Sequence, residues 1–338
     1  MRDRLRNPTI IDVAERAGVS KSVVSRVLTG HGSVGADNRE RVLASAAELG
    51  YVVNAVARAM VACRTHTLGV FVRDASTPFY GYLLTAMQEQ AAERGYRVVT
   101  ATGSGRFAVA DEQRALETLV QLRMEGLVVC SGLLPVSAVV PLAQRLPLVV
   151  AGRPETHEAV SSVFCDEEGG GAGLADYVAD LGHRVVCVLR LSAAQSLSAA
   201  PRVSAMARRL RERGVRVVEL DGGPVEGLDD IVRSVLAQPE ITALMTPSDQ
   251  QAMGVLEALQ RRGLRAPDHL SVTGYDGIGP LSTPVLGLTS WIQPVELIGT
   301  RAVDAVVAQL DRAEAPQHHL ALPGVLAPGM TAARPPRA

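Results

Sequence analysis

The first fifty residues contain three stretches in which apolar residues recur at helical spacing. The first stretch follows Thr9, a residue type that caps helices, and ends before Gly18, which suits a tight turn. Ser20 is placed to cap the second stretch, and Gly50 to end the third, over residues 36–50. The apolar faces are Ile10, Val13, Ala14 and Ala17 in the first, Val23, Val24, Val27 and Leu28 in the second, and Val42, Leu43, Ala46 and Leu49 in the third. The pattern predicts a small three-helix unit.

The first two of these helices are joined by a short turn around Gly18, which is typical of a helix-turn-helix. The second helix of this motif normally lies in the major groove of DNA. Its outward positions here are Lys21, Ser22 and Arg26, and Lys21 is the only lysine in the chain. Such side chains hydrogen-bond to base edges or phosphates. The alternative is a solvated polar face on a helix pair that binds no DNA.

After residue 66 the pattern changes to short apolar runs of strand length, most of them separated by amphipathic stretches. Strands are predicted at 68–72, 97–101, 127–130, 148–151, 185–189, 215–220, 242–245 and 270–274, and helices at 83–94, 112–124, 203–213 and 252–262. This alternation predicts an α/β fold, and so many units indicate two doubly wound parallel sheets. Ligands bind such folds at the carboxyl ends of the strands, often in the cleft between two lobes.

Charge is divided unevenly along the chain, although the 338 residues together carry a net charge of −1. Residues 1–64 carry ten basic and six acidic side chains, and the remainder has an excess of acidic ones. A basic head on an acidic body is what a modular DNA-binding protein requires. The chain has no apolar run of membrane-spanning length, no secretory signal and four scattered cysteines, so we expect a cytoplasmic protein with reduced thiols and no membrane partner.

Sequence motifs for catalysis, metals and cofactors are incomplete in this chain. The glycine runs at 103–105 and 169–173 complete neither a dinucleotide-binding fingerprint nor a phosphate-binding loop with its lysine. The seven histidines do not cluster with cysteines or carboxylates at metal-ligand spacing, and there is no G-x-S-x-G motif. We therefore expect no enzyme activity, no catalytic residue, no metal and no cofactor.

Several longer motifs are shared with one protein family. They are Thr9–Ala14, Gly18–Ser20 and Val24–Leu28, then Asn38–Val42, Ala47–Tyr51 and Asn54–Arg58, and further on Thr77–Tyr80, Leu181–Arg184, Ser248–Asp249, Leu270–Asp276 and Leu288–Gln293. On these residues, in this order and spacing, the chain resembles the LacI/GalR family of bacterial transcription repressors over nearly its whole length.

The resemblance implies an all-α helix-turn-helix headpiece at 1–53, a hinge helix and linker at 54–65, and a two-lobe core at 66–330, with a tail at 331–338. The core is expected to resemble periplasmic binding proteins, with one lobe at about 66–164 plus 294–318. The second lobe is expected at about 165–291 plus the C-terminal segment, and three chain crossovers join the two.

For DNA recognition, the resemblance places four residues of the second helix, Lys21, Ser22, Ser25 and Arg26, at base-reading positions. The hinge helix adds Asn54, Ala57, Arg58 and Met60, and enters the minor groove beside its twin in a dimer. Met60 stands where the family usually inserts a leucine, and methionine is also able to unstack a base step. The alternative is that Met60 only packs between paired hinge helices.

For the effector, the resemblance points to Arg202 and Asp276 as the groups that bind the ligand hydroxyls. Asp249 and Gln293 are nearby candidates, and Phe79 with Tyr80 is expected to form an aromatic lip. The structural alternatives are a surface arginine at a helix start and an aspartate that caps a loop. Aromatic residues are only 3% of the chain, so few side chains could stack on a sugar face.

The expected function is therefore a transcription repressor that acts as a homodimer on a roughly palindromic DNA operator. A small-molecule effector, a sugar or related metabolite, would bind between the core lobes and change operator affinity. The main alternative is a solute-binding protein with no DNA role, and a third is a sugar-metabolising enzyme. Salt-dependent DNA binding would favour the repressor, and ligand turnover would favour the enzyme.

Overall fold

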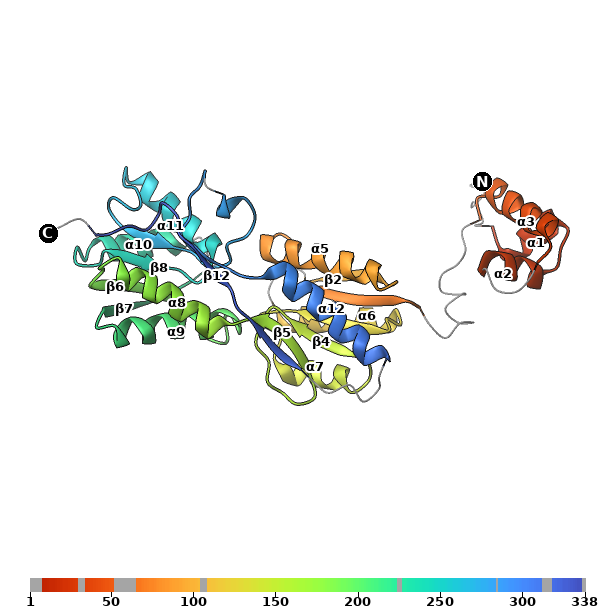
Figure 1. The fold of residues 1–338 in the computed structure, drawn as a ribbon, viewed down its shortest axis with the longest axis horizontal. Helices are drawn as coiled ribbons and strands as arrows, with labels where there is room; N and C mark the ends of the chain where they lie inside the picture. The colour runs from red at the N-terminus through yellow and green to blue at the C-terminus, as the bar shows by residue number, and fades with distance from the viewer. Residues whose placement is uncertain are drawn as a thin grey trace. The chain divides into compact units, whose positions relative to one another are not determined.

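The computed structural model describes residues 8–29, 34–51, 65–103, 108–223, 227–283, 285–311 and 318–335. They fall into two compact units, Met1–Thr65 and His66–Ala338, each of which has its own core (Figure 1). The expected hinge residues Asn54, Ala57, Arg58 and Met60 lie outside the described residues.

The N-terminal unit is a bundle of α1 (Ile10–Ala17), α2 (Lys21–Thr29) and α3 (Ala36–Glu48). The predicted cap of the first helix is confirmed, because the Thr9 hydroxyl accepts from the Asp12 N–H and the Asp12 carboxylate accepts from the Thr9 N–H. Gly18 has a φ of 65°, the left-handed conformation that glycine adopts without strain. The turn between α1 and α2 therefore follows the sequence prediction.

The core of this unit is built from the predicted apolar faces, with one exception. One valine from each helix, Val13, Val24 and Val42, is completely buried in this shared core. Leu43, which we predicted on the inner face of α3, is 49% exposed, so that prediction is wrong. Successive helical residues are rotated by about 100°, so burial of Val42 turns Leu43 outward.

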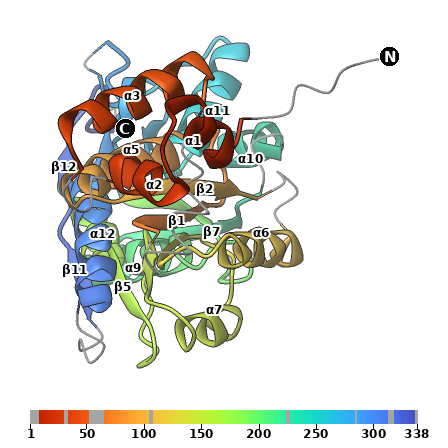
Figure 2. The same cartoon turned by 90° about the vertical axis from the view of Figure 1, so that its right-hand side faces the viewer.

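The first lobe of the C-terminal unit contains a six-stranded sheet in the order β11-β5-β4-β3-β1-β2, with every pairing parallel. Helices α5 and α12 cover one face, and α6 and α7 cover the other (Figure 2). The elements are β1 (Thr67–Val72), α5 (Pro78–Glu93), β2 (Arg97–Thr102), α6 (Val109–Gln121), β3 (Gly126–Cys130), α7 (Val136–Ala143), β4 (Leu148–Ala151), β5 (Ser161–Cys165), α12 (Val295–Asp311) and β11 (His319–Leu322).

The second lobe contains a parallel four-stranded sheet in the order β7-β6-β8-β9. Helices α8 and α9 pack on one face, and α10 and α11 pack on the other (Figure 1). The elements are α8 (Glu167–Asp180), β6 (Val185–Arg190), α9 (Ala199–Glu212), β7 (Arg216–Asp221), α10 (Leu228–Leu236), β8 (Ala243–Met245), α11 (Asp249–Arg261), β9 (Ser271–Thr273), the 3-10 turn η2 (Gly279–Ser282), and an antiparallel pair of β10 (Ser290–Ile292) with β12 (Val325–Ala327).

The chain crosses between the lobes three times, after β5, after β10 and after β11. Trp291 of β10 packs beside all three crossovers. A Cβ on Gly170 or Gly173 of α8 would lie 2.7 Å from the Trp291 indole, and a Cβ on Gly324 would collide with it. The glycine run at 169–173 thus serves packing, as the absence of a complete phosphate-binding motif indicated.

The two parallel sheets and all eight predicted strands are present, with ends that differ by at most one residue. Four strands were not predicted: β5, β10, β11 and β12. They are short, all but the apolar β12 mix polar with apolar residues, and each is held by pairing with a distant segment. The segment expected to be a tail also contacts β9, because the Val272 N–H donates to the Thr331 carbonyl at 2.7 Å.

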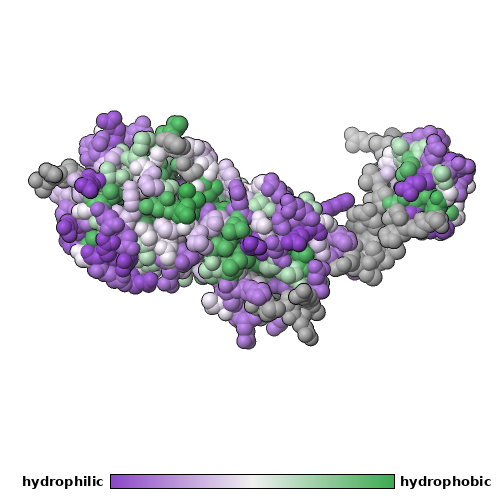
Figure 3. Space-filling view, in the orientation of Figure 1, coloured by the Kyte–Doolittle hydropathy of each residue, from purple (hydrophilic) through white to green (hydrophobic). Residues whose placement is uncertain are grey.

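The surface of the C-terminal unit is largely polar in the view of Figure 3, with apolar side chains gathered over β12 and α12. Exposed apolar residues on β12, β11 and α12 include Val325, Leu320 and Leu297. Among the described residues, no helix is both long and apolar enough to cross a membrane.

Candidate functional site

The outer face of α2 is the first candidate site, because it presents polar side chains on a helix that is fixed from behind. Val24 and Val27 are buried in the headpiece core, while Lys21, Ser22 and Arg26 are exposed and Ser25 is half-buried. The Ser20 and Ser22 hydroxyls lie 2.9 Å apart, and Arg26 Nε donates to the Ser22 carbonyl at 3.3 Å. The surface combines two cationic groups with hydroxyls, the donors and acceptors that DNA phosphates and base edges bind.

The second candidate site is a cavity of about 380 Å³ between the two lobes of the C-terminal unit. This volume is within the range of small-molecule sites. Its walls come from both lobes, and its lining includes Arg73, Asp74, Thr77, Phe79, Tyr80 and Gly152 from the first lobe, and Leu191, Ser196, Ser198, Arg202, Ser248, Gln251, Asp276 and Gln293 from the second lobe and its crossover.

Parallel strands place the polar lining at this cavity. Arg73 directly follows β1, Leu191 follows β6, and Asp276 comes shortly after β9. Because the carboxyl ends of parallel strands meet at one edge of a sheet, loops that are far apart in sequence converge there. The cavity therefore lies where the alternating pattern predicted a ligand site.

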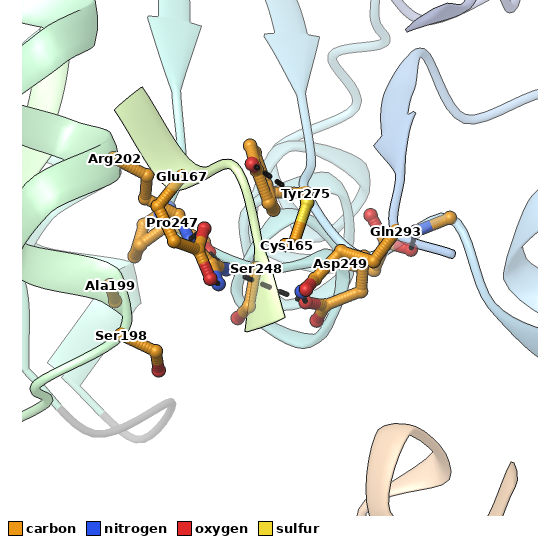
Figure 4. Close-up of polar contacts among 12 residues, drawn as sticks. Cys165, Glu167, Ser198, Ala199, Arg202, Pro247, Ser248, Asp249, Tyr275 and Gln293 are labelled. Carbon is orange, nitrogen blue, oxygen red and sulfur yellow. Dashed lines mark hydrogen bonds and ion pairs between the residues drawn. The ribbon is translucent and has the colours of Figure 1, made fainter. Parts of the chain in front are cut away.

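Arg202 on α9 is the centre of a buried charge network (Figure 4). It is 4% exposed, and its Nε and Nη2 each donate to Glu167 at 2.7 Å in a bidentate pair. Its Nη1 donates to the Pro247 carbonyl at 2.8 Å and lies 3.5 Å from Asp276 Oδ1, and its Cζ is 4.0 Å from the centre of the Tyr275 ring. Burial raises the pKa of Glu167, and the guanidinium opposes this rise. Most donors of Arg202 are thus used inside the protein.

Asp276 is held at the cavity edge in an unusual backbone conformation, with a φ of 132°. Its side chain is 18% exposed, and Oδ1 accepts from Gln293 Nε2 at 2.7 Å. Burial raises the pKa of Asp276 to about 7, with a further contribution from Asp249, while Arg202 opposes the rise. The structure therefore holds this carboxylate where ionisation is disfavoured.

Asp249 lies behind the cavity rather than in its lining. Its Oδ2 accepts from the Gly277 N–H at 2.7 Å, and its Oδ1 accepts from the Ser290 hydroxyl at 2.6 Å. Burial raises the pKa of Asp249, and these hydrogen bonds oppose the rise. The residue joins the start of α11 to the loop after β9 and to β10, which positions the neighbouring Asp276.

The opposite wall, in the first lobe, carries a second group of charged residues. Arg73 Nε lies 3.9 Å from the buried carboxylate of Glu112, and Arg153 Nη1 lies 3.1 Å from Glu155. Burial raises the pKa of Tyr80 to about 12, so this phenol stays protonated at neutral pH. Arg73, which lines the cavity, and Arg153, which is buried behind it, thus both have carboxylate neighbours within the lobe.

The lobes also touch across the cleft, away from the crossovers. The Leu197 N–H in the loop before α9 donates to the Gly132 carbonyl after β3 at 2.7 Å. A Cβ on Gly132 would lie 3.5 Å from the Ser198 hydroxyl and 3.4 Å from Arg73 Nη1. One side of the cavity is therefore closed by direct contact between the lobes.

Five of the six expected effector residues line the cavity: Phe79, Tyr80, Arg202, Asp276 and Gln293. The sixth, Asp249, does not. The sequence reasoning did not include Arg73, Glu167, Gln251 or the serines at 196 and 198. A usable signal existed for Arg73, which is a charged residue directly after the predicted strand that became β1.

Comparisons with known proteins cover both units. Residues 9–54 match the model of the bacterial regulatory proteins of the lacI family, and residues 175–331 match a periplasmic binding protein-like domain. The ribose operon repressor of Escherichia coli (strain K12) is 30% identical over 331 residues, which span 94% of this chain and 98% of that protein.

Solved structures give a similar result. The Lac repressor dimer bound to operator and the anti-inducer ONPF has a TM-score of 0.81 at 26% identity, covering 96% of this chain and 99% of that one. The complex of the transcriptional regulator CelR with cellobiose has a TM-score of 0.68 at 26% identity, covering 96% and 100%.

Proposed function

The chain belongs to the LacI family of bacterial regulatory proteins, and from this premise we propose how it acts. It is a DNA-binding transcription regulator with an effector-binding core, and it binds operator DNA as a homodimer. We infer that it is a cytoplasmic repressor with no catalytic role. In this proposal residues 1–53 read DNA, 54–65 form the hinge, and 66–330 bind the effector.

The observation that carries the proposal is the exposed face of α2. Lys21, Ser22 and Arg26 are presented to solvent by a helix whose opposite side is buried. We assign direct base contacts to these three residues and a supporting contact to Ser25. Each headpiece of a dimer reads half of a roughly palindromic site.

The effector acts through the cavity between the lobes. A ligand that touches Asp276 on one wall and Tyr80 on the other favours one arrangement of the lobes over another. It changes operator affinity only as far as its affinity differs between those arrangements. We propose that this difference reaches DNA through the hinge and that Met60 enters the minor groove.

The alternative function is a solute-binding protein that has a similar core and no role on DNA. The periplasmic binding protein-like match over residues 175–331 accommodates this alternative, whereas the headpiece does not. Binding of a specific DNA site by the full-length chain separates the two.

The test is a selection of bound fragments from sheared genomic DNA of the source organism by the purified full-length protein, without added ligand. We expect one palindromic site to be enriched. Failure to enrich any site, both without ligand and with a metabolite mixture, would contradict the proposal.

Variants then assign the contacts on the selected site. Lys21→Ala and Arg26→Ala are each expected to weaken specific binding by about 10- to 100-fold, because one base contact contributes ~1–3 kcal/mol. Met60→Ala is expected to weaken specific binding while leaving non-specific binding nearly unchanged. The control is Arg265→Ala, which removes an exposed arginine of the core. Equal losses on specific and non-specific DNA for Met60→Ala would refute its assignment.

A further inference from the structure

The wall of the cavity that belongs to the second lobe carries acceptor atoms that receive no hydrogen bond. Gln293 and Gln251 are 4% and 9% exposed, and Oε1 of each accepts nothing from the described residues. The amide orientations are determined, because Gln293 Nε2 donates to Asp276 Oδ1 and Gln251 Nε2 donates to the Gly223 carbonyl at 2.9 Å. Both oxygens are enclosed by protein, so this side of the cavity is short of donors although neither oxygen meets the occupant directly.

Asp276 adds a third acceptor to the same wall. Its two protein contacts, from Gln293 and Arg202, both fall on Oδ1. Its carboxylate lines the cavity, and Oδ2 receives no hydrogen bond from the described residues. The three side chains Asp276, Gln293 and Gln251 form what we call the acceptor wall.

Charge distinguishes an ammonium donor from a hydroxyl donor. Around Asp276, α9 supplies one guanidinium from Arg202, while α8 and α11 supply the carboxylates of Glu167 and Asp249. Glu167 already engages Arg202 through two bonds, and the hydrogen bonds to Asp249 come from neutral donors, among them Gly277 N–H and Ser290 O–H. Negative charge is therefore in excess beside the acceptor wall.

The opposite wall does not correct this excess. Arg73 and Arg153 lie beside the carboxylates of Glu112 and Glu155. Asp74 also lines the cavity, where its carboxylate accepts from the Ser76 N–H at 2.9 Å and from the Thr77 hydroxyl at 3.1 Å. Among these described residues, Arg73, Arg202, Asp74 and Asp276 line the cavity, and behind them one further guanidinium group lies among four further carboxylates. In a site of low dielectric, a positive group on the occupant would be favoured over a neutral one.

We propose that the effector of this protein is an amine, whose protonated nitrogen donates to Asp276 Oδ2. This inference rests on the proposed role of the cavity as the effector site. An ammonium group brings a donor for Asp276 Oδ2 and one positive charge, which offsets the excess of carboxylates. A hydroxyl would also satisfy this acceptor but would leave the charge excess in place.

The test uses amines paired with neutral compounds of the same size: D-glucosamine with D-glucose, D-galactosamine with D-galactose, and 1,4-diaminobutane with 1,4-butanediol. Binding to the full-length protein is measured by calorimetry at pH 7.5 in the presence of EDTA, which removes metal cations. At least one amine is expected to bind 10-fold or more tightly than its neutral partner. Its binding is expected to release protons, detected in buffers with different ionisation heats, because an adjacent positive charge lowers the pKa of Asp276.

Two variants locate the bound amine. Asp276→Asn keeps the size of the side chain and is expected to weaken amine binding at least 10-fold more than it weakens binding of the neutral partner, because only the amine loses a charge pair. Asp221→Asn, which removes an exposed carboxylate outside the cavity, is expected to change neither. The fluorescence of Trp291 verifies that each variant is folded.

Three results would overturn the inference: no amine of the panel binds, a neutral partner binds as tightly as its amine, or Asp276→Asn leaves amine binding unchanged. The DNA selection is run on the same protein without ligand, so the two proposals fail separately. A protein that enriches an operator but binds no amine keeps the proposed function and loses this inference. A protein that binds an amine through Asp276 but enriches no site keeps the cavity chemistry and loses the regulator.

Discussion

Replacing Asp276 by asparagine is expected to stabilise the core at alkaline pH. The pKa of Asp276 is about 7 in the folded protein, against an ordinary value of 3.8. Between these values the folded state binds a proton that the unfolded state does not, so stability falls as pH rises and levels off above pH 7. Each pH unit in this interval corresponds to about 1.4 kcal/mol.

The magnitude follows from this interval. Wild-type protein is expected to lose ~3 kcal/mol between pH 5 and pH 8 through Asp276 alone. The amide introduced by Asp276→Asn does not titrate in this range, and asparagine keeps the same size and also tolerates a positive φ. The free energy of unfolding of the variant minus that of wild type is therefore expected to be ~3 kcal/mol larger at pH 8 than at pH 5.

The assay is urea unfolding of the full-length chain at pH 5, 6, 7 and 8, followed by tryptophan fluorescence. The chain has one tryptophan, Trp291, which packs in the core beside the crossovers, so the signal reports that unit alone. Asp74→Asn is the control, because the pKa of Asp74 lies below its ordinary value in the folded protein. Burial raises this pKa, but hydrogen bonds from Ser76 and Thr77 outweigh the rise. This variant is not expected to change the pH profile between 5 and 8. Parallel profiles for wild type and Asp276→Asn would refute the reasoning.

Three further predictions concern the packing around the site and the headpiece. Glu167→Gln breaks the bidentate pair with Arg202 and should lower the free energy of unfolding by ~3 kcal/mol. Arg202→Met should lower it further, because Glu167, Asp276 and Asp249 then lose their shared cation. A coupling energy near zero between these two substitutions in a double-mutant cycle would contradict the pair. Gly173→Ala, whose added Cβ would meet the Trp291 ring, should destabilise the core by ~1–3 kcal/mol and alter Trp291 fluorescence. Gly81→Ala, with open space at its Cβ in α5, should be neutral or stabilising, and equal effects of the two variants would argue against crowding at Trp291. Thr9→Ala should cost the headpiece ~1 kcal/mol, seen as faster hydrogen exchange of α1 amides, and unchanged exchange would show that the cap contributes nothing.

The sequence was most informative where the structure depends on neighbours in the chain. The cap at Thr9, the turn at Gly18 and the buried face through Val13 and Val24 all rest on contacts within one or two helical turns or between adjacent helices. The buried strands were also recognisable, since strands covered on both faces of a sheet are apolar throughout. The short strand β10 was not, because it is held by pairing with β12 more than thirty residues later.

The candidate effector residues came from family resemblance, and only the tertiary structure decided what each one contacts. Sequence order could not separate Asp249 from Asp276, yet the first is enclosed by Gly277 and Ser290 while the second keeps an oxygen toward the cavity. Nor could it show that Glu167, thirty-five residues before Arg202, engages most of that arginine's donors.

The sequence by itself therefore determined the helix-turn-helix, the alternating α/β pattern and the edge of the sheets where a ligand would bind. The tertiary structure decided which acceptors at that edge lack a donor and how the surrounding charges balance. The physical reason is one of range. Capping, turns and periodic burial are set by residues close together in the chain, whereas hydrogen bonding and electrostatics in a buried site depend on the distances among side chains that only folding brings together.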